Sequence, residues 1–315
     1  MNTIVSKLLF IFLIFLSQLL FAQNSKNNKK QQEIILQLQW KHQFQFAGYY
    51  IAKEKGYYKD INLDVQIKEF DYSVDLIKDI LEEKTHFATG RSSLIVNKSY
   101  GDKLTLLAAI FQASADVLVA LKDSEIYTIE DFKNKKIMIT GDAKNDAVYK
   151  SMLFSQHINI DDMEVLKHSF MLEDLVNKKT DLMASYISNE PFRLKEEFGL
   201  ESIIFDPKDY GFDFYGDILF TSENLAKNDP DLVRKFKTAS LKGWQYAFNN
   251  IEESVDIILK KYNSQNRSKE ALLYEAKELK KLAYYKTNNL GEIDINKIQR
   301  IYDAYKLMGT AKANA

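Results

Sequence analysis

Flat aromatic and hydrogen-bonding side chains gather where the first predicted strand ends. The apolar run at 34–40 finishes in Trp40, and His42, Gln43 and Phe46 follow on the predicted turn. A ring in this place can cover one face of a planar ligand, which is worth about 0.5–1.5 kcal/mol beyond the area that is buried. His42 and Gln43 would then supply hydrogen bonds, and Phe46 would line the same wall. The alternative for Trp40 is a core tryptophan at the end of a strand.

A second polar cluster is the segment ATGRSS at 88–93, which ends one predicted strand and begins a helix. Gly90 permits close approach of the backbone, and Ser92 and the helix start offer hydrogen-bond donors. Arg91 could pair with a carboxylate or a sulfonate. The alternative for this arginine is an exposed side chain without a ligand.

A strand, a glycine and a helix start follow one another in ITGDAKNDAVY at 139–149. Such a turn can hold an anion on its backbone N–H groups, and Gly141 stands where the chain would bend. The carboxylates of Asp142 and Asp146 should repel a phosphate ester, so the expected ligand is neutral or cationic and unphosphorylated. The alternative is that Asp142 or Asn145 simply caps the helix.

The segment SYISNEPF at 185–192 joins a predicted strand to a helix that Pro191 would start. Glu190 would lie near the strand end and accept hydrogen bonds from amino or ring N–H groups of a ligand. Tyr186 and Asn189 are further candidates for contact. The alternative for Glu190 is an acid that stabilises the helix start by about 0.3–1 kcal/mol.

Composition excludes several classes of chemistry. The 315 residues include no cysteine and four histidines, and 43 basic residues nearly balance 44 acidic ones. A thiolate nucleophile, a disulfide framework and a Cys-ligated metal are therefore excluded, and a net charge of −1 offers no general attraction for nucleic acid. We expect no catalytic residue, no metal and no cofactor.

The chain that must position these residues alternates short apolar strands with amphipathic helices, which predicts α/β sheets covered by helices. Ligands of such sheets bind at the carboxyl ends of the strands. Thr128 with Asp131 predicts a capped short helix, and Asp229 followed by Pro230 predicts the start of a long one. The predicted strands are 34–40, 62–70, 86–90, 105–111, 116–122, 135–140, 164–170, 181–187, 202–206 and 217–222.

The first 32 residues predict an exported protein. Lys7 precedes an apolar segment that ends at Ala22, and a polar run follows. Residues 1–22 are therefore predicted to be a secretory signal peptide, with 23–32 as a polar linker. An uncleaved membrane anchor is the alternative, and either one places the rest of the chain outside the cytoplasm, in the periplasm.

Three segments together resemble the NMT1/THI5-like and SsuA-like family of periplasmic solute-binding proteins. They are LQLQWKHQFQFAGYYIAKEKGYYKDINLDV at 36–65, SYISNEPF at 185–192, and GDILFTSENLAKNDPDLVRKFKTASLKGWQYAF at 216–248. The resemblance extends over residues 33–308. It implies a type II periplasmic-binding fold, with two α/β lobes joined by two crossing strands. The implied lobes are 33–117 plus 218–315 for lobe one, and 118–217 for lobe two.

The resemblance also implies residues near the crossings. Gln112 and Ser114 would offer polar contacts at the hinge. Phe214 or Tyr215, at the second crossing, could stack opposite Trp40 and complete a two-sided aromatic clamp.

The implied function is capture of a small nitrogen heterocycle, such as a thiamine-pyrimidine precursor, for the membrane permease of an ABC importer. The expected protein is a monomer that closes by hinge motion on its ligand. One alternative is a sensor that reports the ligand to a membrane kinase or cyclase. A second is a THI5-type pyrimidine synthase, which is less expected because those enzymes are cytosolic and carry a cysteine-rich motif.

Overall fold

A computed structural model describes residues 31–312 of the chain. The predicted signal peptide at 1–22 and all but the last two residues of the predicted linker lie outside this part. Within it, no helix has the length and apolar character that a membrane crossing requires.

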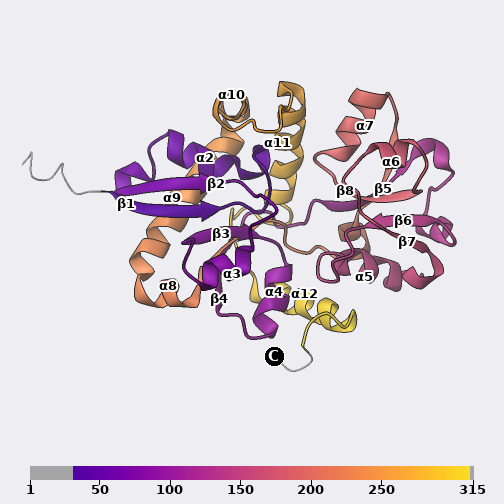
Figure 1. Ribbon diagram of the computed structural model, residues 1–315, viewed down its shortest axis with the longest axis horizontal. Coiled ribbons are helices and arrows are strands. Elements are labelled where there is room, and N and C mark those ends of the chain that lie inside the picture. Colours follow the sequence, from indigo (N-terminus) through magenta and orange to yellow (C-terminus); the bar gives the residue numbers. More distant parts are fainter. Residues whose placement is uncertain (1–30, 313–315) are drawn as a thin grey trace, which may run out of the picture.

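Within residues 31–312, ten strands form two five-stranded sheets, which lie side by side and give this part of the chain two lobes (Figure 1). The first sheet has the order β2-β1-β3-β10-β4, and the second has the order β7-β6-β8-β5-β9. In each sheet one strand, β10 or β5, runs antiparallel to both of its neighbours. The strands are β1 (Gln32–Gln37), β2 (Leu63–Lys68), β3 (Phe87–Gly90), β4 (Leu104–Ala109), β5 (Asp116–Leu121), β6 (Lys136–Ile139), β7 (Glu164–Lys167), β8 (Leu182–Tyr186), β9 (Ser202–Phe205) and β10 (Ile218–Ser222).

The chain passes between the sheets twice, from β4 to β5 and from β9 to β10. We call the part built on the first sheet the first lobe and the part built on the second sheet the second lobe. This alternating α/β architecture confirms the predicted fold class, and each predicted strand overlaps an observed one.

Helices cover both sheets. Those of the first lobe are α2 (Ala47–Glu54), α3 (Leu76–Leu81), α4 (Ser93–Ser99), α8 (Glu223–Asn228), α9 (Pro230–Asn249), α10 (Ile251–Lys261) and α11 (Lys269–Ala283). Those of the second lobe are α5 (Ala147–Ser155), α6 (Glu173–Val176) and α7 (Glu190–Phe198). The last helix, α12 (Ile295–Leu307), contacts both α4 and α5 and so bridges the two lobes.

Two predicted helix starts are confirmed. The Asp229 side chain accepts a hydrogen bond from Leu232 N at 3.0 Å, with Pro230 in the first turn of α9. Thr128 and Asp131 form a reciprocal capping box on a short 3-10 helix.

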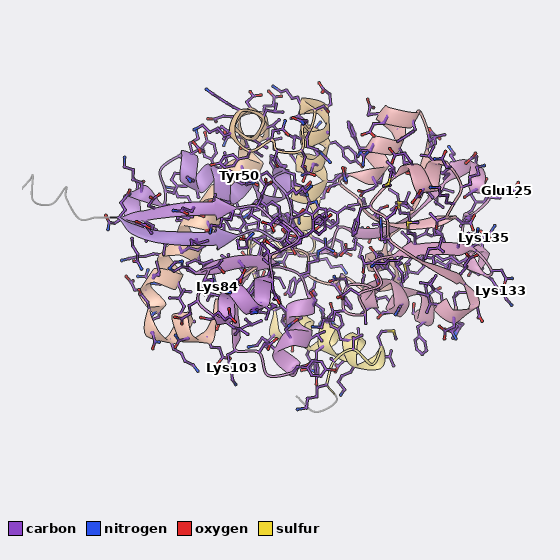
Figure 2. All side chains as sticks on the ribbon, viewed as in Figure 1. Tyr50, Lys84, Lys103, Glu125, Lys133 and Lys135 are labelled. Carbon is purple, nitrogen blue, oxygen red and sulfur yellow. The ribbon has the colours of Figure 1, made fainter. Side chains whose placement is uncertain are left out.

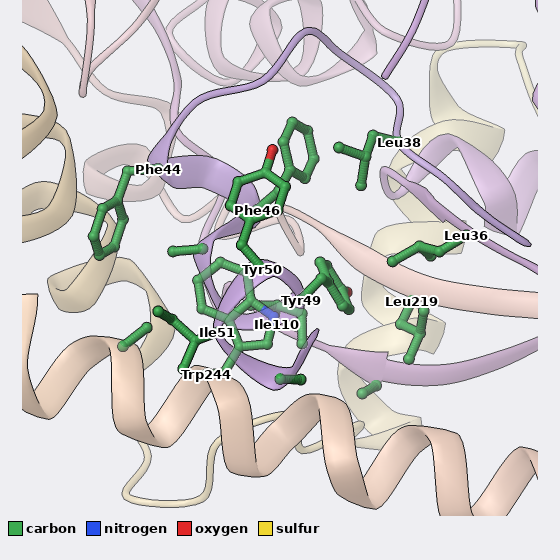
Figure 3. Close-up of a cluster of buried hydrophobic side chains, with 14 of the residues drawn as sticks. Leu36, Leu38, Phe44, Phe46, Tyr49, Tyr50, Ile51, Ile110, Leu219 and Trp244 are labelled. Atoms are coloured by element: carbon green, nitrogen blue, oxygen red, sulfur yellow. The ribbon is translucent and has the colours of Figure 1, made fainter. Parts of the chain in front are cut away.

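Helix α2 is held against α9 by a close backbone approach. A Cβ atom on Gly243 would lie 2.0 Å from the carbonyl oxygen of Gly48, so only glycine fits there. Trp244, fully buried next to this contact, lies edge-on to Tyr49 with ring centroids 5.7 Å apart (Figure 3). This packing fixes the start of α2 and with it the preceding turn, which reaches the space between the lobes.

The parallel strands direct their carboxyl ends toward the gap between the lobes. Trp40, Arg91, Thr140, His168 and Tyr186 lie at or just beyond the ends of β1, β3, β6, β7 and β8. In contrast, charged side chains such as Lys84 and Lys103 of the first lobe and Lys133 of the second project outward (Figure 2). The strand ends therefore define where a ligand site is expected.

Candidate functional site

A cavity of about 250 Å³ lies between the lobes and is lined from both of them. The first lobe contributes Trp40, Gln43, Gln45 and Arg91, and the loop between α10 and α11 adds Gln265 and Arg267. The crossing and the second lobe contribute Asp116, Thr140, Tyr149, His168, Phe170, Tyr186, Asn189, Glu190 and Arg193, together with four smaller or apolar residues at 172 and 183–185. Six of the residues predicted from the sequence are in this wall: Trp40, Gln43, Arg91, Tyr186, Asn189 and Glu190.

Aromatic rings from both lobes meet at one end of the cavity. Trp40 is half-buried and stacks with Phe70 at a centroid distance of 5.8 Å and an interplanar angle of 15°. Phe170, from the loop after β7, approaches Trp40 to 6.1 Å and stacks on His168 at 4.7 Å. Trp40 thus faces an aromatic partner from the opposite lobe, as a clamp for a flat ligand requires.

The aromatic partner of Trp40 is Phe170 and not the predicted Phe214 or Tyr215. Phe214 is buried and packs on Tyr305 of α12 at 5.2 Å, while the Tyr215 hydroxyl accepts a hydrogen bond from Asp294 N at 2.8 Å. The prediction that either ring stacks opposite Trp40 is wrong, because the second crossing passes behind the cavity, on the side of α12. Phe170 could have been found by the rule that selected Trp40, since it also follows a strand end.

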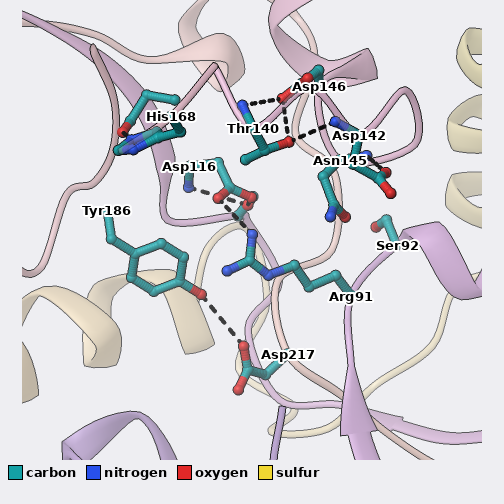
Figure 4. A network of polar contacts seen from close by, with 12 residues as sticks. Arg91, Ser92, Asp116, Thr140, Asp142, Asn145, Asp146, His168, Tyr186 and Asp217 are labelled. Atoms are coloured by element: carbon teal, nitrogen blue, oxygen red, sulfur yellow. Dashed lines mark hydrogen bonds and ion pairs between the residues drawn. The ribbon is translucent and has the colours of Figure 1, made fainter. Parts of the chain in front are cut away.

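Arg91 lies at the centre of a polar network (Figure 4). Its Nη1 is 3.1 Å from Asp116 Oδ1, and its guanidinium carbon lies 5.4 Å from the centroid of the Tyr186 ring. Ser114 Oγ donates to the other oxygen of Asp116 at 2.5 Å. Arg91 therefore already has an acid partner, which a ligand anion would have to displace.

A buried polar link below the cavity joins residues of both lobes. Gln45 Nε2 donates to both oxygens of Asp217, at 2.9 and 3.1 Å, and Tyr186 Oη donates to Asp217 Oδ1 at 3.4 Å. Asp217 is 1% exposed, and this burial raises its pKa to about 7.

The turn after β1 is held by a second buried acid. Glu275 of α11 accepts hydrogen bonds from Phe44 N at 3.2 Å and Gln45 N at 2.9 Å, and burial raises its pKa to about 7. Residues 44–46 form a 3-10 helix, so consecutive side chains point in different directions. Gln43 and Gln45 reach the cavity, whereas Phe46 is fully buried in the core.

Several residues predicted to contact the ligand do not line the cavity. Phe46 does not line the cavity, and His42 turns away from it, because His42 Nδ1 is 2.8 Å from the Tyr50 hydroxyl. The lack of a side chain on Gly90 accommodates Leu94, since an added Cβ would lie 2.9 Å from Leu94 Cδ1.

Three other predicted residues have internal partners. Ser92 Oγ donates to Tyr215 O at 2.8 Å, and Ser92 and Ser114 border only a void of about 10 Å³ behind Arg91. Gln112 Nε2 donates to the carbonyl oxygens of Ala109 and Glu292, at 3.0 and 2.8 Å, so it stabilises the crossing.

In the loop after β6, the backbone N–H groups that could bind a ligand anion are bonded to the carboxylate of Asp146. Asp146 Oδ1 accepts from Thr140 N at 3.1 Å and Oδ2 accepts from Gly141 N at 2.8 Å, so these backbone donors are already used. Asp146 is 1% exposed, and Asp142 lies with Asn145 on an open outer groove. Neither acid lines the cavity, so these two carboxylates do not face a ligand bound there.

Glu190 lines the cavity, but both of its oxygens have partners in its own segment. Oε2 accepts from Tyr186 N at 2.7 Å, and Oε1 accepts from Asn189 Nδ2 at 2.6 Å. This geometry favours the alternative interpretation of Glu190, an acid that organises the start of α7.

The cavity wall carries three guanidinium groups and two carboxylates: Arg91, Arg193, Arg267, Asp116 and Glu190. Arg193 forms a bidentate pair with Glu197, at 2.7 and 2.8 Å. Arg193 and Arg267 were not among the residues predicted from the sequence. Only Arg193 could have been identified there, because it follows Glu190 by three residues at a predicted helix start. Residues 31–312 contain no group of acids and histidines that could hold a metal ion.

The chain is similar in sequence to two proteins that are named for the ligand they bind. The riboflavin-binding protein RibY of Chloroflexus aurantiacus is 24% identical over 242 residues, which are 72% of this chain and 66% of that protein. The match thus spans just under two thirds of RibY. The formylaminopyrimidine-binding protein of Halalkalibacterium halodurans is 22% identical over 233 residues, 73% of this chain and 69% of the relative.

Solved structures show the same fold. The periplasmic aliphatic sulphonate binding protein SsuA from Escherichia coli aligns with a TM-score of 0.70 at 11% identity, covering 88% of this chain and 87% of that one. The ligand-binding component of an ABC-type import system from Staphylococcus aureus aligns with a TM-score of 0.66 at 15% identity, covering 89% and 92%. The desulfurization enzyme DSZB aligns with a TM-score of 0.63 at 11% identity, covering 89% and 93%, so this fold also supports catalysis.

These alignments confirm the periplasmic binding protein fold. The family described as NMT1/THI5 like matches residues 43–254, which is more than half of the chain. The resemblance found in the sequence is thereby confirmed, and the chain belongs to the NMT1/THI5-like family.

Proposed function

We propose that this protein is an exported solute-binding protein that captures a small, planar nitrogen heterocycle and delivers it to the permease of an ABC importer. The observation that carries the proposal is the aromatic pair Trp40 and Phe170, which come from opposite lobes and meet over one cavity. A flat ring seated in the cavity beside this pair would contact both lobes at once. We propose no catalytic role.

Ligand binding would stabilise the closed arrangement of the lobes. Contacts already join the two lobes: Trp40 approaches Phe170, and Lys144 Nζ lies 3.2 Å from Asn97 Oδ1. Tyr274 Oη of α11 also donates to Ile187 O at 3.2 Å. A ligand that touches both walls adds contacts only when the lobes are together, so it shifts the population toward closure.

The cavity and the relatives support a single-ring ligand. Its volume of about 250 Å³ lies just below the range of about 300–1,000 Å³ that is usual for small-molecule sites. The relatives bind riboflavin and formylaminopyrimidine according to their names, and the second of these is the smaller. We therefore propose a pyrimidine related to the thiamine precursor as the ligand.

The ligand is further proposed to be unphosphorylated. The carboxylate of Asp146 occupies the backbone donors of Thr140 and Gly141, which a phosphate group would otherwise use. Tight binding of a phosphomonoester in preference to its parent alcohol would contradict this part of the proposal.

The test is a thermal-shift and fluorescence titration of the purified protein with the hydroxymethylpyrimidine of thiamine, its phosphomonoester, riboflavin and taurine. A bound ring raises Tm by mass action and changes the emission of Trp40 above the background of the buried Trp244. Trp40→Ala should weaken binding about tenfold or more, since the loss of a stacking face and its buried area exceeds about 1.4 kcal/mol.

The matched control is Tyr72→Ala, because Tyr72 is an aromatic residue on the same rim but is 78% exposed and does not line the cavity. An equal loss of affinity in both variants, or no heterocycle that binds at all, would refute the proposal. Binding without ATP-driven uptake in vesicles that contain the permease would instead support the sensor.

A further inference from the structure

Arg267 is the one guanidinium group of the cavity wall that has no acid partner among residues 31–312. Arg91 pairs with Asp116 and Arg193 pairs with Glu197. The side chain of Arg267 forms no ion pair and no hydrogen bond within these residues, and its buried Nε is unpartnered.

The backbone at Arg267 is nevertheless held firmly. Arg267 N donates to Asn263 Oδ1 at 2.8 Å, and Asn263 Nδ2 donates back to Arg267 O at 3.0 Å. Gln265 of the same loop donates to His42 O at 2.8 Å, which ties the loop to the turn after β1. Arg267 is half-buried and therefore differs from a mobile surface arginine.

The acids around Arg267 have other partners. Glu275 accepts from two backbone N–H groups, and burial raises its pKa to about 7, with the charge of Arg267 opposing. Glu197 is taken by Arg193, and both oxygens of Glu190 are bonded within their own segment. The donors of Arg267 thus remain unused in a partly dehydrated wall, where an unmade hydrogen bond is costly.

We propose that Arg267 determines specificity by recognising an acceptor-only edge of the ligand, meaning two adjacent acceptor atoms. Such an edge is a ring carboxylate or a carbonyl oxygen beside a ring nitrogen, and the planar guanidinium fork matches either one with two parallel hydrogen bonds. This inference rests on the proposed function and narrows it to heterocycles that carry such an edge, which the hydroxymethylpyrimidine of thiamine itself lacks.

The first test needs no ligand. Arg267→Gln should leave the Tm of the ligand-free protein unchanged or raise it, because this side chain forms no ion pair and no hydrogen bond among residues 31–312. Arg91→Gln should lower Tm, since it leaves Asp116 without its ion pair. Arg234→Gln, which removes an exposed arginine of α9, serves as the control. A fall in Tm for Arg267→Gln as large as that for Arg91→Gln would show a structural role and overturn the inference.

The second test is titration calorimetry with two matched pairs of rings. One pair is pyridine-3-carboxylate and pyridine-3-carboxamide, and the other is cytosine and 2,4-diaminopyrimidine, in which an amino group replaces the carbonyl. The wild-type protein and Arg234→Gln should bind either pyridine-3-carboxylate or cytosine at least tenfold more tightly than the other member of its pair. The pair that shows this difference tells whether the recognised edge is a carboxylate or a carbonyl oxygen beside a ring nitrogen. In Arg267→Gln the preference should fall to within twofold, and Arg267→Lys should lie between.

The outcomes separate the two proposals. A preference that survives in Arg267→Gln, or equal binding of both members by the wild-type protein, overturns the role of Arg267 and leaves the proposed function standing. Failure of the wild-type protein to bind any ring, here and in the panel above, overturns the proposed function, while the ligand-free comparison still decides the role of Arg267.

Discussion

Replacement of Asp217 by Asn should change how the stability of the protein depends on pH. Asp217 lies below the cavity, is 1% exposed and is contacted by Gln45 and Tyr186. Burial raises its pKa from 3.8 to about 7, so the folded protein favours the protonated form. Asn resembles that neutral form in shape and cannot ionise.

The sign and the size of this pH dependence of stability follow from proton linkage. Between pH 3.8 and about 7 the folded protein keeps a proton that the unfolded chain has released, so this group makes stability fall as pH rises. A shift from 3.8 to about 7 corresponds to at most about 4 kcal/mol at about 1.36 kcal/mol per unit. Roughly 3 kcal/mol of this belongs to the interval from about pH 5 to about pH 8.

The assay is urea unfolding of both proteins at several pH values, followed by fluorescence of the buried Trp244. The free energy of unfolding of Asp217→Asn minus that of the wild-type protein should increase by up to about 3 kcal/mol from about pH 5 to about pH 8. Other titrating groups cancel in this difference. Asp64→Asn, at an exposed position of β2, serves as the control substitution. A difference for Asp217→Asn that does not vary with pH would refute the argument.

Two further substitutions test the packing and the loop that shape the site. Gly243→Ala should lower the free energy of unfolding in urea by about 3 kcal/mol, because the added Cβ would meet the backbone of Gly48 and Ala52. An unchanged urea midpoint would disprove the close contact between α2 and α9. Glu190→Gln should lower stability by about 1 kcal/mol with little change in ligand affinity, because the carboxylate bonds to Tyr186 N and Asn189. A large loss of affinity at unchanged Tm would restore Glu190 as a ligand contact.

The elements could be predicted because burial on one face leaves a periodic signal. The alternation at 62–70 corresponds to β2, in which Leu63 and Val65 are buried. Helix α3 begins at Leu76, because Asp75 accepts from Lys78 N and so caps the helix. Local side-chain hydrogen bonds of this kind move boundaries without altering the order of the elements.

The wall of the cavity could be predicted only where a strand end supplies it. Trp40, Arg91 and Tyr186 all lie at or just beyond the carboxyl ends of strands, and all three line the cavity. Arg267 lies on a loop between two helices, far along the chain, and only the packing of α11 against the turn after β1 brings it there. No local pattern marks such a residue, because its position depends on contacts between distant segments.

The charge of the cleft shows why residue type alone is a weak guide to electrostatics. Asp146 was expected to repel phosphate from the cavity, yet its carboxylate is buried on the backbone donors of Thr140 and Gly141. A phosphate would therefore be excluded by competition for those donors, and the effect would persist at high salt, whereas repulsion between exposed charges would be screened. The same pairing removes Asp146 from the charge that a ligand meets, whereas the guanidinium group of Arg267, which has no acid partner among residues 31–312, lies in the cavity wall.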